Sequence, residues 1–197
     1  MTYRVWSWQF LISEMIFCLF IPCLVHSQAI KSGSAQYLQA ANGFKDLKLG
    51  SITKLIPAYK LAYMDGNNKP DADSCYRYIY QDDNILNLAD GLMLDRVGLR
   101  TYNNRIVEIY LFFRYADGYK VLKNFIANYG VCNDRPADFT YIWNTGDVNL
   151  SLHYEEGLDL GVAVFSSKKM RQLVQQNSIK MAATQKAIAT SVSIAGN

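Results

Sequence analysis

Residues 96–113 read RVGLRTYNNRIVEIYLFF and carry the clearest structural signal in the chain. The runs on either side of Asn103 and Asn104 are rich in branched and aromatic residues, which are typical of β-strands. The two asparagines tolerate positive φ angles, so they favour a two-residue turn between antiparallel strands. We therefore predict strands over 96–102 and 105–113, joined as a hairpin within a β-sheet.

A helix is expected directly downstream, over residues 118–128. Asp117 precedes it as a capping residue, and Gly130 follows it where a positive φ angle ends a helix. Its apolar side chains recur at helical spacing: Val121, Leu122, Phe125, Ile126 and Tyr129. This pattern predicts that one side of the helix packs on the sheet.

The same order of patterns then returns along the chain. Three strands are predicted, the last two forming a second hairpin around the turn EEG: 139–143 (FTYIW), 148–154 and 158–165. Ser166 or Ser167 is placed to cap a further helix that ends near Gln176. The sequence therefore predicts strand, hairpin and helix a second time.

The two hairpins can be aligned as a tandem repeat. A displacement of 154 − 102 = 52 positions matches four pairs of residues: Tyr102 with Tyr154, Ile106 with Leu158, Phe112 with Val164, and Phe113 with Phe165. The repeats would cover 44–130 and 131–176. Chance alignment is the alternative, because any two alternating hairpins produce such matches.

The region before the central hairpin contains one more strand and an acidic loop. Residues 75–81 (CYRYIYQ) alternate in polarity and predict a strand. Residues 65–74 contain three aspartates, which raises the question of a calcium loop. An EF-hand needs glycine at its sixth position and glutamate at its twelfth, and the pattern fails from both Asp65 and Asp71. A solvated loop is therefore expected.

The two ends of the chain differ from its middle in composition. Arg4 followed by the apolar run 15–25 predicts a secretory signal peptide over 1–27, cleaved before Gln28. The run is shorter than the roughly 20 residues of a membrane-spanning helix, although an uncleaved anchor is the alternative.

Two further segments are set apart from the core of the chain. Residues 28–43 are small and polar and are expected to form a flexible leader, and residues 177–197 are expected to form a weakly helical or disordered tail. Between them, residues 44–176 predict a single α+β domain. We expect two layers, with helices on one face of an antiparallel sheet.

Cleavage after residue 27 would leave one histidine, His153, one tryptophan, Trp143, and the cysteines Cys75 and Cys132. Two cysteines in an exported protein predict a Cys75–Cys132 disulfide, with two free buried cysteines as the alternative. One histidine and two cysteines do not complete a four-ligand zinc site without carboxylates. No metal site and no cofactor are therefore expected.

The charge pattern disfavours nucleic acid as a partner. The formal net charge is only +3, and the sequence lacks the clustered lysine and arginine residues that nucleic-acid-binding proteins carry. Phosphate-binding glycine motifs are also absent from the sequence.

One set of residues suggests nucleophilic catalysis: Ser151, His153 and Asp159. Ser151 and His153 share one face of their predicted strand, and pairing Tyr154 with Leu158 would bring Asp159 opposite His153. Side chains two residues apart on a strand diverge, which leaves the serine too far from the histidine for a nucleophile–base pair. We assign no catalytic residue, and whether the protein is an enzyme stays open with the balance against it.

Aromatic residues give a more consistent signal, for binding. The chain has 14 tyrosines, and Tyr141 and Trp143 share one face of their predicted strand. Together with Tyr102, Asn103 and Asn104 at the first hairpin, they are our candidate binding residues. The alternative is that the aromatic rings pack between sheet and helix.

The layout resembles a known family. Two consecutive small α+β units over 44–176 are similar to the beta-lactamase inhibitor protein family, and residues 47–55 (LKLGSITKL) resemble the start of small bacterial envelope modules. The resemblance implies binding through sheet and loops without chemistry, and no contact residues are carried over from it.

We therefore expect an exported, noncatalytic binding protein of the inhibitor or immunity type, periplasmic or secreted, that recognises a protein or glycan. A structural envelope or assembly module is the first alternative, and a hydrolase without a recognisable motif is the second. No stable membrane span is expected after signal cleavage.

Overall fold

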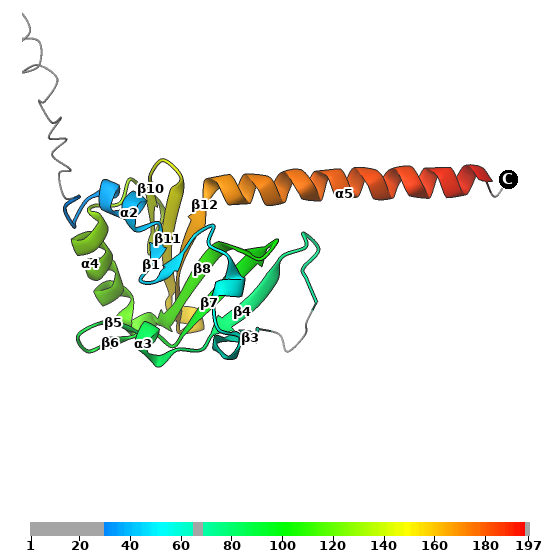
Figure 1. The fold of residues 1–197 in the computed structure, drawn as a ribbon. Coiled ribbons are helices and arrows are strands. Elements are labelled where there is room, and N and C mark those ends of the chain that lie inside the picture. Colours follow the sequence, from blue (N-terminus) through cyan, green and yellow to red (C-terminus); the bar gives the residue numbers. More distant parts are fainter. Residues whose placement is uncertain (1–29, 65–68, 196–197) are drawn as a thin grey trace, which may run out of the picture.

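A computed structural model describes residues 30–64 and 69–195 of the protein. Its centre is an eight-stranded antiparallel sheet (Figure 1). From one edge to the other the strands are β3 (Leu61–Tyr63), β4 (Tyr76–Tyr80), β7 (Arg96–Tyr102), β8 (Arg105–Arg114), β12 (Leu160–Ser167), β11 (Val148–Glu155), β10 (Thr140–Asn144) and β9 (Asp134–Ala137).

The order of the strands divides the sheet into two halves. Strands β3, β4, β7 and β8 follow one another in space as in sequence, and so do β9, β10, β11 and β12. The last strand of each half lies at the centre, where β8 pairs with β12 through partners such as Phe112 and Val162. The centre of the sheet is thus built from segments far apart in the chain.

Three longer helices and several short elements complete the fold. The helices are α2 (Ala35–Ala41), α4 (Gly118–Tyr129) and α5 (Lys168–Ala195). The short elements are the paired strands β1 (Gly43–Phe44) and β2 (Leu47–Lys48), the paired strands β5 (Asn87–Ala89) and β6 (Leu92–Met93), the helix α3 (Asp83–Leu86), and the 3-10 turns η2 (Thr53–Leu55), η3 (Ala58–Lys60), η4 (Tyr115–Asp117) and η5 (Glu156–Leu158).

The main core lies between the sheet and α4. Alternate residues of the central strands point to this face, as the two-residue period of a strand requires. Those that are fully buried include Leu99, Ile109, Leu111, Phe113, Leu150, Leu152 and Phe165, and α4 contributes Val121 and Phe125. Helix α4 begins at the predicted residue, continues one residue beyond the predicted end, and stops at Gly130 with a φ angle of 80°. Four of the five predicted apolar residues are buried, but Ile126 is exposed, and the Asp117 side chain makes no capping hydrogen bond.

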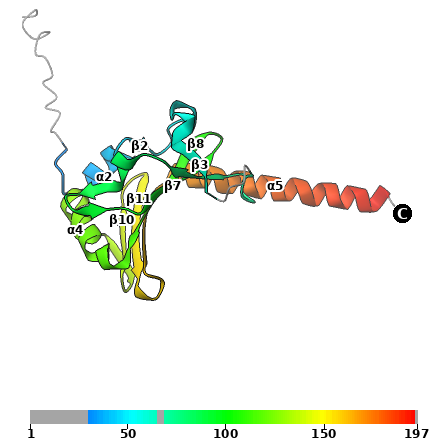
Figure 2. The ribbon, with the colours of Figure 1, turned by 90° about the horizontal axis from the view of Figure 1, so that it is seen from below.

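The start of α5 lies on the opposite face of the sheet. Met170 and Val174 form a second, smaller cluster with Cys75, Tyr102 and Val107. Beyond this contact α5 extends away from the sheet (Figures 1 and 2). The prediction of an α+β fold with an antiparallel sheet is confirmed, but the helices do not all lie on one face.

The first hairpin is confirmed in detail. Strand β7 has the predicted bounds, and Tyr102 pairs with Arg105 across the turn. Asn103 and Asn104 have φ angles of 48° and 57°, as a turn of this type requires. The register shifts by one residue between Arg100 and Thr101, which leaves Val107 unpaired on β8.

The second hairpin has a different register from the predicted one. Tyr154 lies opposite Gly161, and His153 lies opposite Val162 rather than Asp159. The reason is that the chain forms the turn η5 after Glu155, so strand β12 begins only at Leu160.

The ends of the domain are more ordered than composition suggested. The expected leader over 28–43 contains the helix α2, which Ser34 caps by accepting a hydrogen bond from the Tyr37 N–H, and which buries Leu38 completely. Further contacts attach the segment to the body: the Tyr37 ring stacks on Tyr129 at 6.2 Å, and the Gln39 side chain accepts hydrogen bonds from the Thr145 hydroxyl and the Asp147 N–H. The predicted signal peptide lies outside the described residues.

The C-terminal helix is longer than predicted. The sequence predicts a helix that ends near Gln176 and a weakly helical or disordered tail over 177–197, whereas α5 continues as one helix to Ala195. Alanine, glutamine, lysine and methionine favour helices even without an apolar face, and this composition explains the extension. Among the described residues no helix has both the length and the apolar character that crossing a membrane requires.

The disulfide prediction is wrong, because both cysteines are free in the structure. Cys75 is buried in the cluster beneath α5, whereas Cys132 packs against the main core on the other face of the sheet. The sheet itself therefore lies between the two thiols.

Candidate functional site

The aromatic residues singled out in the sequence do not form a surface patch. Trp143 is 1% exposed, Tyr141 is 8% exposed and Tyr102 is 6% exposed. The indole N–H of Trp143 donates a hydrogen bond of 2.7 Å to the Gly130 carbonyl. These rings pack in the core, as the alternative held, and only Asn103 and Asn104 of the five candidates are exposed.

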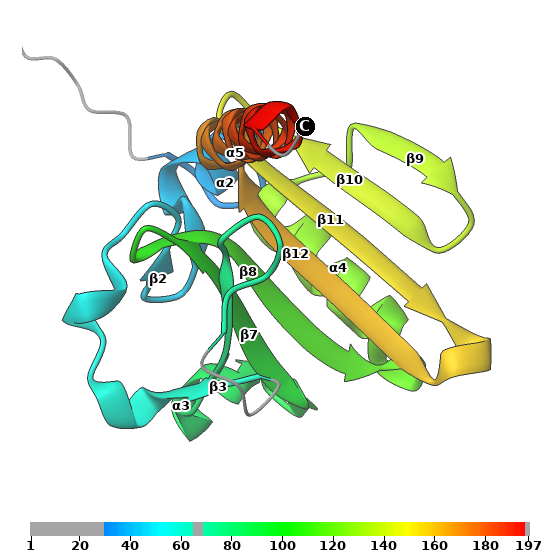
Figure 3. The ribbon, with the colours of Figure 1, turned by 90° about the vertical axis from the view of Figure 1, so that its right-hand side faces the viewer.

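The surface that the fold leaves open is the sheet face opposite α4. Figure 3 looks onto this face, with α4 behind the strands and α5 projecting toward the viewer. The register of the strands places several half-buried apolar or aromatic side chains on this face, among them Ile79, Tyr110, Phe112, Ile142, Val162 and Val164. We call these six residues the open-face cluster.

The sequence did contain a signal for this cluster. Residues 109–113 of β8 (IYLFF) are apolar on both faces of the strand, while a strand with one solvated face alternates with polar residues. The prediction of binding residues from surface tyrosine and tryptophan missed this signal, because the signal lies in apolar residues at the alternate positions of β8, which face away from α4.

Aromatic stacking orders the centre of the open face. The Arg96 guanidinium lies 4.4 Å from the centre of the Phe112 ring, and the rings of Phe112 and Tyr110 are stacked with centres 6.1 Å apart. Gly98 pairs with Tyr110 on the neighbouring strand, and a Cβ atom there would come within 3.0 Å of Met64 Cε. The missing side chain at Gly98 makes room for the aromatic stack and for Met64.

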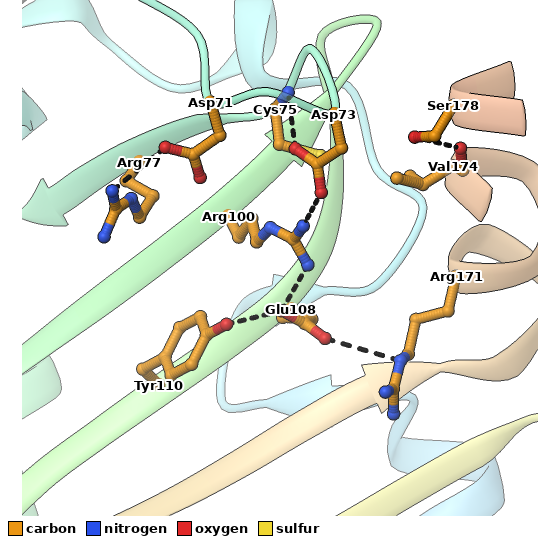
Figure 4. Close-up of polar contacts among 10 residues, drawn as sticks. All are labelled: Asp71, Asp73, Cys75, Arg77, Arg100, Glu108, Tyr110, Arg171, Val174 and Ser178. Carbon is orange, nitrogen blue, oxygen red and sulfur yellow. Dashed lines mark hydrogen bonds and ion pairs between the residues drawn. The ribbon is translucent and has the colours of Figure 1, made fainter. Parts of the chain in front are cut away.

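A charged network borders the open face beside α5 (Figure 4). The buried Glu108 carboxylate accepts a hydrogen bond of 3.1 Å from Arg100 and another from the Tyr110 hydroxyl, and Arg171 of α5 lies 3.6 Å away. Arg100 also forms an ion pair with Asp73 in the loop before β4. The network joins three segments: that loop, the β7–β8 hairpin and α5.

The Tyr110 hydroxyl acts as a donor in this network. Burial raises its pKa above the ordinary value, and its hydrogen bond to the negative Glu108 carboxylate raises it further. Because the phenol therefore stays protonated, it supports the carboxylate as a fixed part of the structure. This arrangement holds charge in place and does not prepare a group for proton transfer.

The acidic loop 65–74 contributes ion pairs where it is described. Asp71 pairs with Arg77 at 2.9 Å, and Asp73 accepts a hydrogen bond of 3.2 Å from the Cys75 N–H besides its pair with Arg100. These contacts replace the solvated loop with an anchored one. In the part of the chain that the structure describes, no group of three or more His, Cys, Asp or Glu is arranged to hold a metal ion.

The two cysteines should differ strongly in reactivity. Burial raises the pKa of the Cys75 thiol to about 12, while Cys132 is partly exposed. At pH 8 we expect iodoacetamide to label Cys132 in the folded protein and to leave Cys75 unmodified until denaturant is added. Labelling is followed peptide by peptide by mass spectrometry, and equal rates at both cysteines in the folded state would contradict the burial of Cys75.

His153 and Ser151 do not form a catalytic group. His153 Nδ1 lies 2.9 Å from the Thr140 hydroxyl, and Nε2 lies 3.7 Å from the Glu155 carboxylate. Ser151 pairs with Ile142 and Val164 across the sheet, and Asp159 lies in the turn before β12. The Ser151, His153 and Asp159 constellation is therefore not assembled, because the hairpin register differs from the one it needs.

Comparison of the chain with models of protein families, with curated proteins and with solved structures finds no match. The resemblance to beta-lactamase inhibitor proteins thus rests on the layout of the elements alone. The candidate site is the open face of the sheet with its apolar cluster and charged border.

Proposed function

We propose that the protein is a noncatalytic binding protein that recognises a partner protein through the open face of its sheet. The observation that carries the proposal is the open-face cluster, which places six apolar side chains on the one broad sheet face that α4 leaves uncovered. Monomeric proteins rarely leave contiguous apolar surface without a purpose in binding.

The distribution of polar groups supports a protein partner. Arg77, Arg96 and His153 are exposed around the apolar centre, and Arg171 borders it beside α5. An apolar centre with a polar rim is the usual anatomy of a protein interface, and arginine and tyrosine are enriched there. A broad sheet floor is also wider than the enclosed pockets that small ligands occupy.

We further propose an exported protein of the inhibitor or immunity type, periplasmic or secreted, built from two tandem α+β repeats. The signal pattern in residues 1–27 supports export. The strand order supports the repeats, because each half is a four-stranded meander whose last strand lies at the centre. The different lengths of the two hairpin turns explain why a displacement of 52 does not hold through both strands of each hairpin.

Helix α5 favours a second candidate, an envelope or assembly module. It extends from the open face well past Met181, whose sulfur accepts a hydrogen bond from the Ser74 hydroxyl. A projecting helix offers a partner a second attachment beside the sheet. Both candidates use the open face, and they differ in whether α5 is also needed.

The test is site-specific crosslinking in the native host. A photoreactive amino acid replaces Ser151 or Val164 on the open face, or Lys123 on the outer side of α4 as the control. We expect one crosslinked partner from both open-face positions and none from position 123. Equal crosslinking of the partner from position 123, or no crosslinked partner from any of the three positions, would contradict the proposal. A partner whose crosslinking needs residues 182–195 would favour the assembly module.

A further inference from the structure

A second concave site lies at the β3 edge of the sheet, on the α4 side. A cleft of about 570 Å³ separates strands β3 and β4 from the loop that contains the turns η2 and η3. Leu61 and Tyr63 of β3 and Tyr78 of β4 form its floor, and Lys54 and Pro57 of the loop form its outer wall. No residue of this cleft belongs to the open-face cluster.

Aromatic rings line the floor of this cleft. The centres of the Tyr63 and Tyr78 rings are 4.9 Å apart, and Tyr76 lies 6.4 Å from Tyr63. Burial raises the pKa of Tyr78 to about 12, and its hydrogen bond to Tyr63 acts in the same direction. The Tyr78 phenol is therefore neutral over the physiological range. Leu55, which also lines the cleft, is 80% exposed. An aromatic floor of this kind favours the binding of a large apolar or aromatic side chain.

The backbone of β3 is also available. The Lys60 carbonyl accepts a hydrogen bond of 2.8 Å from the Gln81 N–H, and the Met64 N–H donates one of 3.0 Å to the Arg77 carbonyl. Antiparallel strands bond a neighbour through alternate residues, so the N–H and C=O of Tyr63 point away from β4. Strand β3 is the edge of the sheet, so these groups face its outer side.

The two edge strands of the sheet differ in the residues that prevent further strand pairing. Strand β9 at the far edge carries Asp134, Arg135 and Pro136, and charges and proline are common means of preventing further strand pairing. Strand β3 (LAY) has neither a charge nor a proline. The contrast indicates that the β3 edge is open to an added strand while the β9 edge is protected.

The charge of the residues that line the cleft indicates which kind of partner strand it would bind. Among the described residues that line the cleft, Lys54 is the one charged side chain and none is acidic. We propose that the β3 edge and the tyrosine cleft bind an extended acidic segment of a partner protein, which pairs with Tyr63 as an added strand, inserts an apolar or aromatic side chain beside Tyr78, and places a carboxylate near Lys54. This site goes beyond the open face and is independent of it.

The experiment starts from a displayed library of random 12-residue peptides selected on the full chain. We expect enriched peptides with alternating residues, a bulky apolar residue and acidic neighbours. The strongest peptide is then synthesised with a single N-methyl group at each position in turn. Strand addition predicts about a tenfold loss of affinity at alternate positions only, the effect of losing one backbone hydrogen bond and clashing with the edge.

Two substitutions place the peptide on the protein without disturbing the core. Lys54→Glu is expected to weaken an acidic peptide about threefold or more and to shift the selected peptides toward basic ones. Lys123→Glu on the exposed side of α4 is the matched control, because it makes the same change of charge away from the cleft, and it should leave peptide binding unchanged. A response to Lys123→Glu, no dependence on Lys54→Glu, or no alternation in the N-methyl series would each overturn the proposal.

A second copy of the chain is the competing occupant of the edge. Analytical ultracentrifugation across a hundredfold range of concentration distinguishes it, because an edge-to-edge dimer would form as concentration rises and would be displaced by the peptide. We expect the chain to stay monomeric. A dimer that the peptide dissociates would replace the partner segment with a second copy. The outcome is separate from the crosslinking on the open face, so either proposal can fail alone.

Discussion

Replacing Trp143 by alanine is expected to lower the free energy of unfolding by about 3–5 kcal/mol. The indole is almost completely buried, its ring meets Phe125 edge to face at 6.0 Å, and its N–H satisfies the Gly130 carbonyl at the end of α4. The substitution leaves a cavity between helix and sheet and removes the hydrogen-bond donor of the partly buried Gly130 carbonyl. Urea denaturation followed by circular dichroism measures the change.

Trp143→Phe separates packing from the hydrogen bond. It keeps most of the apolar volume and loses the N–H donor, so we expect a cost of about 1–2 kcal/mol. If Trp143→Ala folded as stably as the natural protein and lost only partner binding, Trp143 would be a surface residue and the fold described above would be wrong at this point.

Replacing Arg100 by methionine is expected to lower the free energy of unfolding by about 3 kcal/mol. Glu108 is buried, and it would lose its closest cation, while Asp73 would lose its ion pair. Removing one partner of a buried pair costs more than the pair itself contributes, because the remaining charge loses compensation. Here Glu108 would keep only Arg171, at 3.6 Å, and the hydrogen bond from the Tyr110 hydroxyl. The change is measured by thermal and urea unfolding.

Two further variants test whether the uncompensated charge is the cause. Arg100→Met combined with Glu108→Gln should regain part of the lost stability, since the charge itself is removed. Arg114→Met is the matched control, because Arg114 is largely exposed and its partner Asp117 keeps Lys120 at 3.1 Å. We expect less than about 1 kcal/mol for that control. An equal loss in both arginine variants would argue against a buried network.

The sequence was sufficient for the elements whose signals are local. The hairpin around Asn103 and Asn104, and α4 with its end at Gly130, depend on turn chemistry and periodicity within a few residues. The second hairpin shows the limit, because residues 156–158 form a 3-10 turn that no single residue announces. The pairing register therefore differs by three residues from the predicted one, and His153 lies opposite Val162 instead of Asp159.

The candidate site could not be located in the same way. Whether an aromatic residue is exposed depends on which face of the sheet a helix covers, and that is decided by tertiary packing. Alternation correctly placed Tyr141 and Trp143 on one face, yet that face is the one beneath α4. The disulfide prediction failed for a related reason, since cysteine count says nothing about which side of a sheet each thiol occupies.

The position of β12 has a consequence for how the chain reaches this structure. It is the last of the eight strands to be synthesised, yet it lies at the centre of the sheet against β8. Until residues 160–167 arrive, β8 has an open edge and apolar side chains on both faces, which is the kind of segment that associates with other chains. The half of the sheet that contains β8 therefore cannot complete its folding before the half that contains β12 is synthesised. A ribosome-bound or translocating chain must keep β8 shielded until its final strand is available.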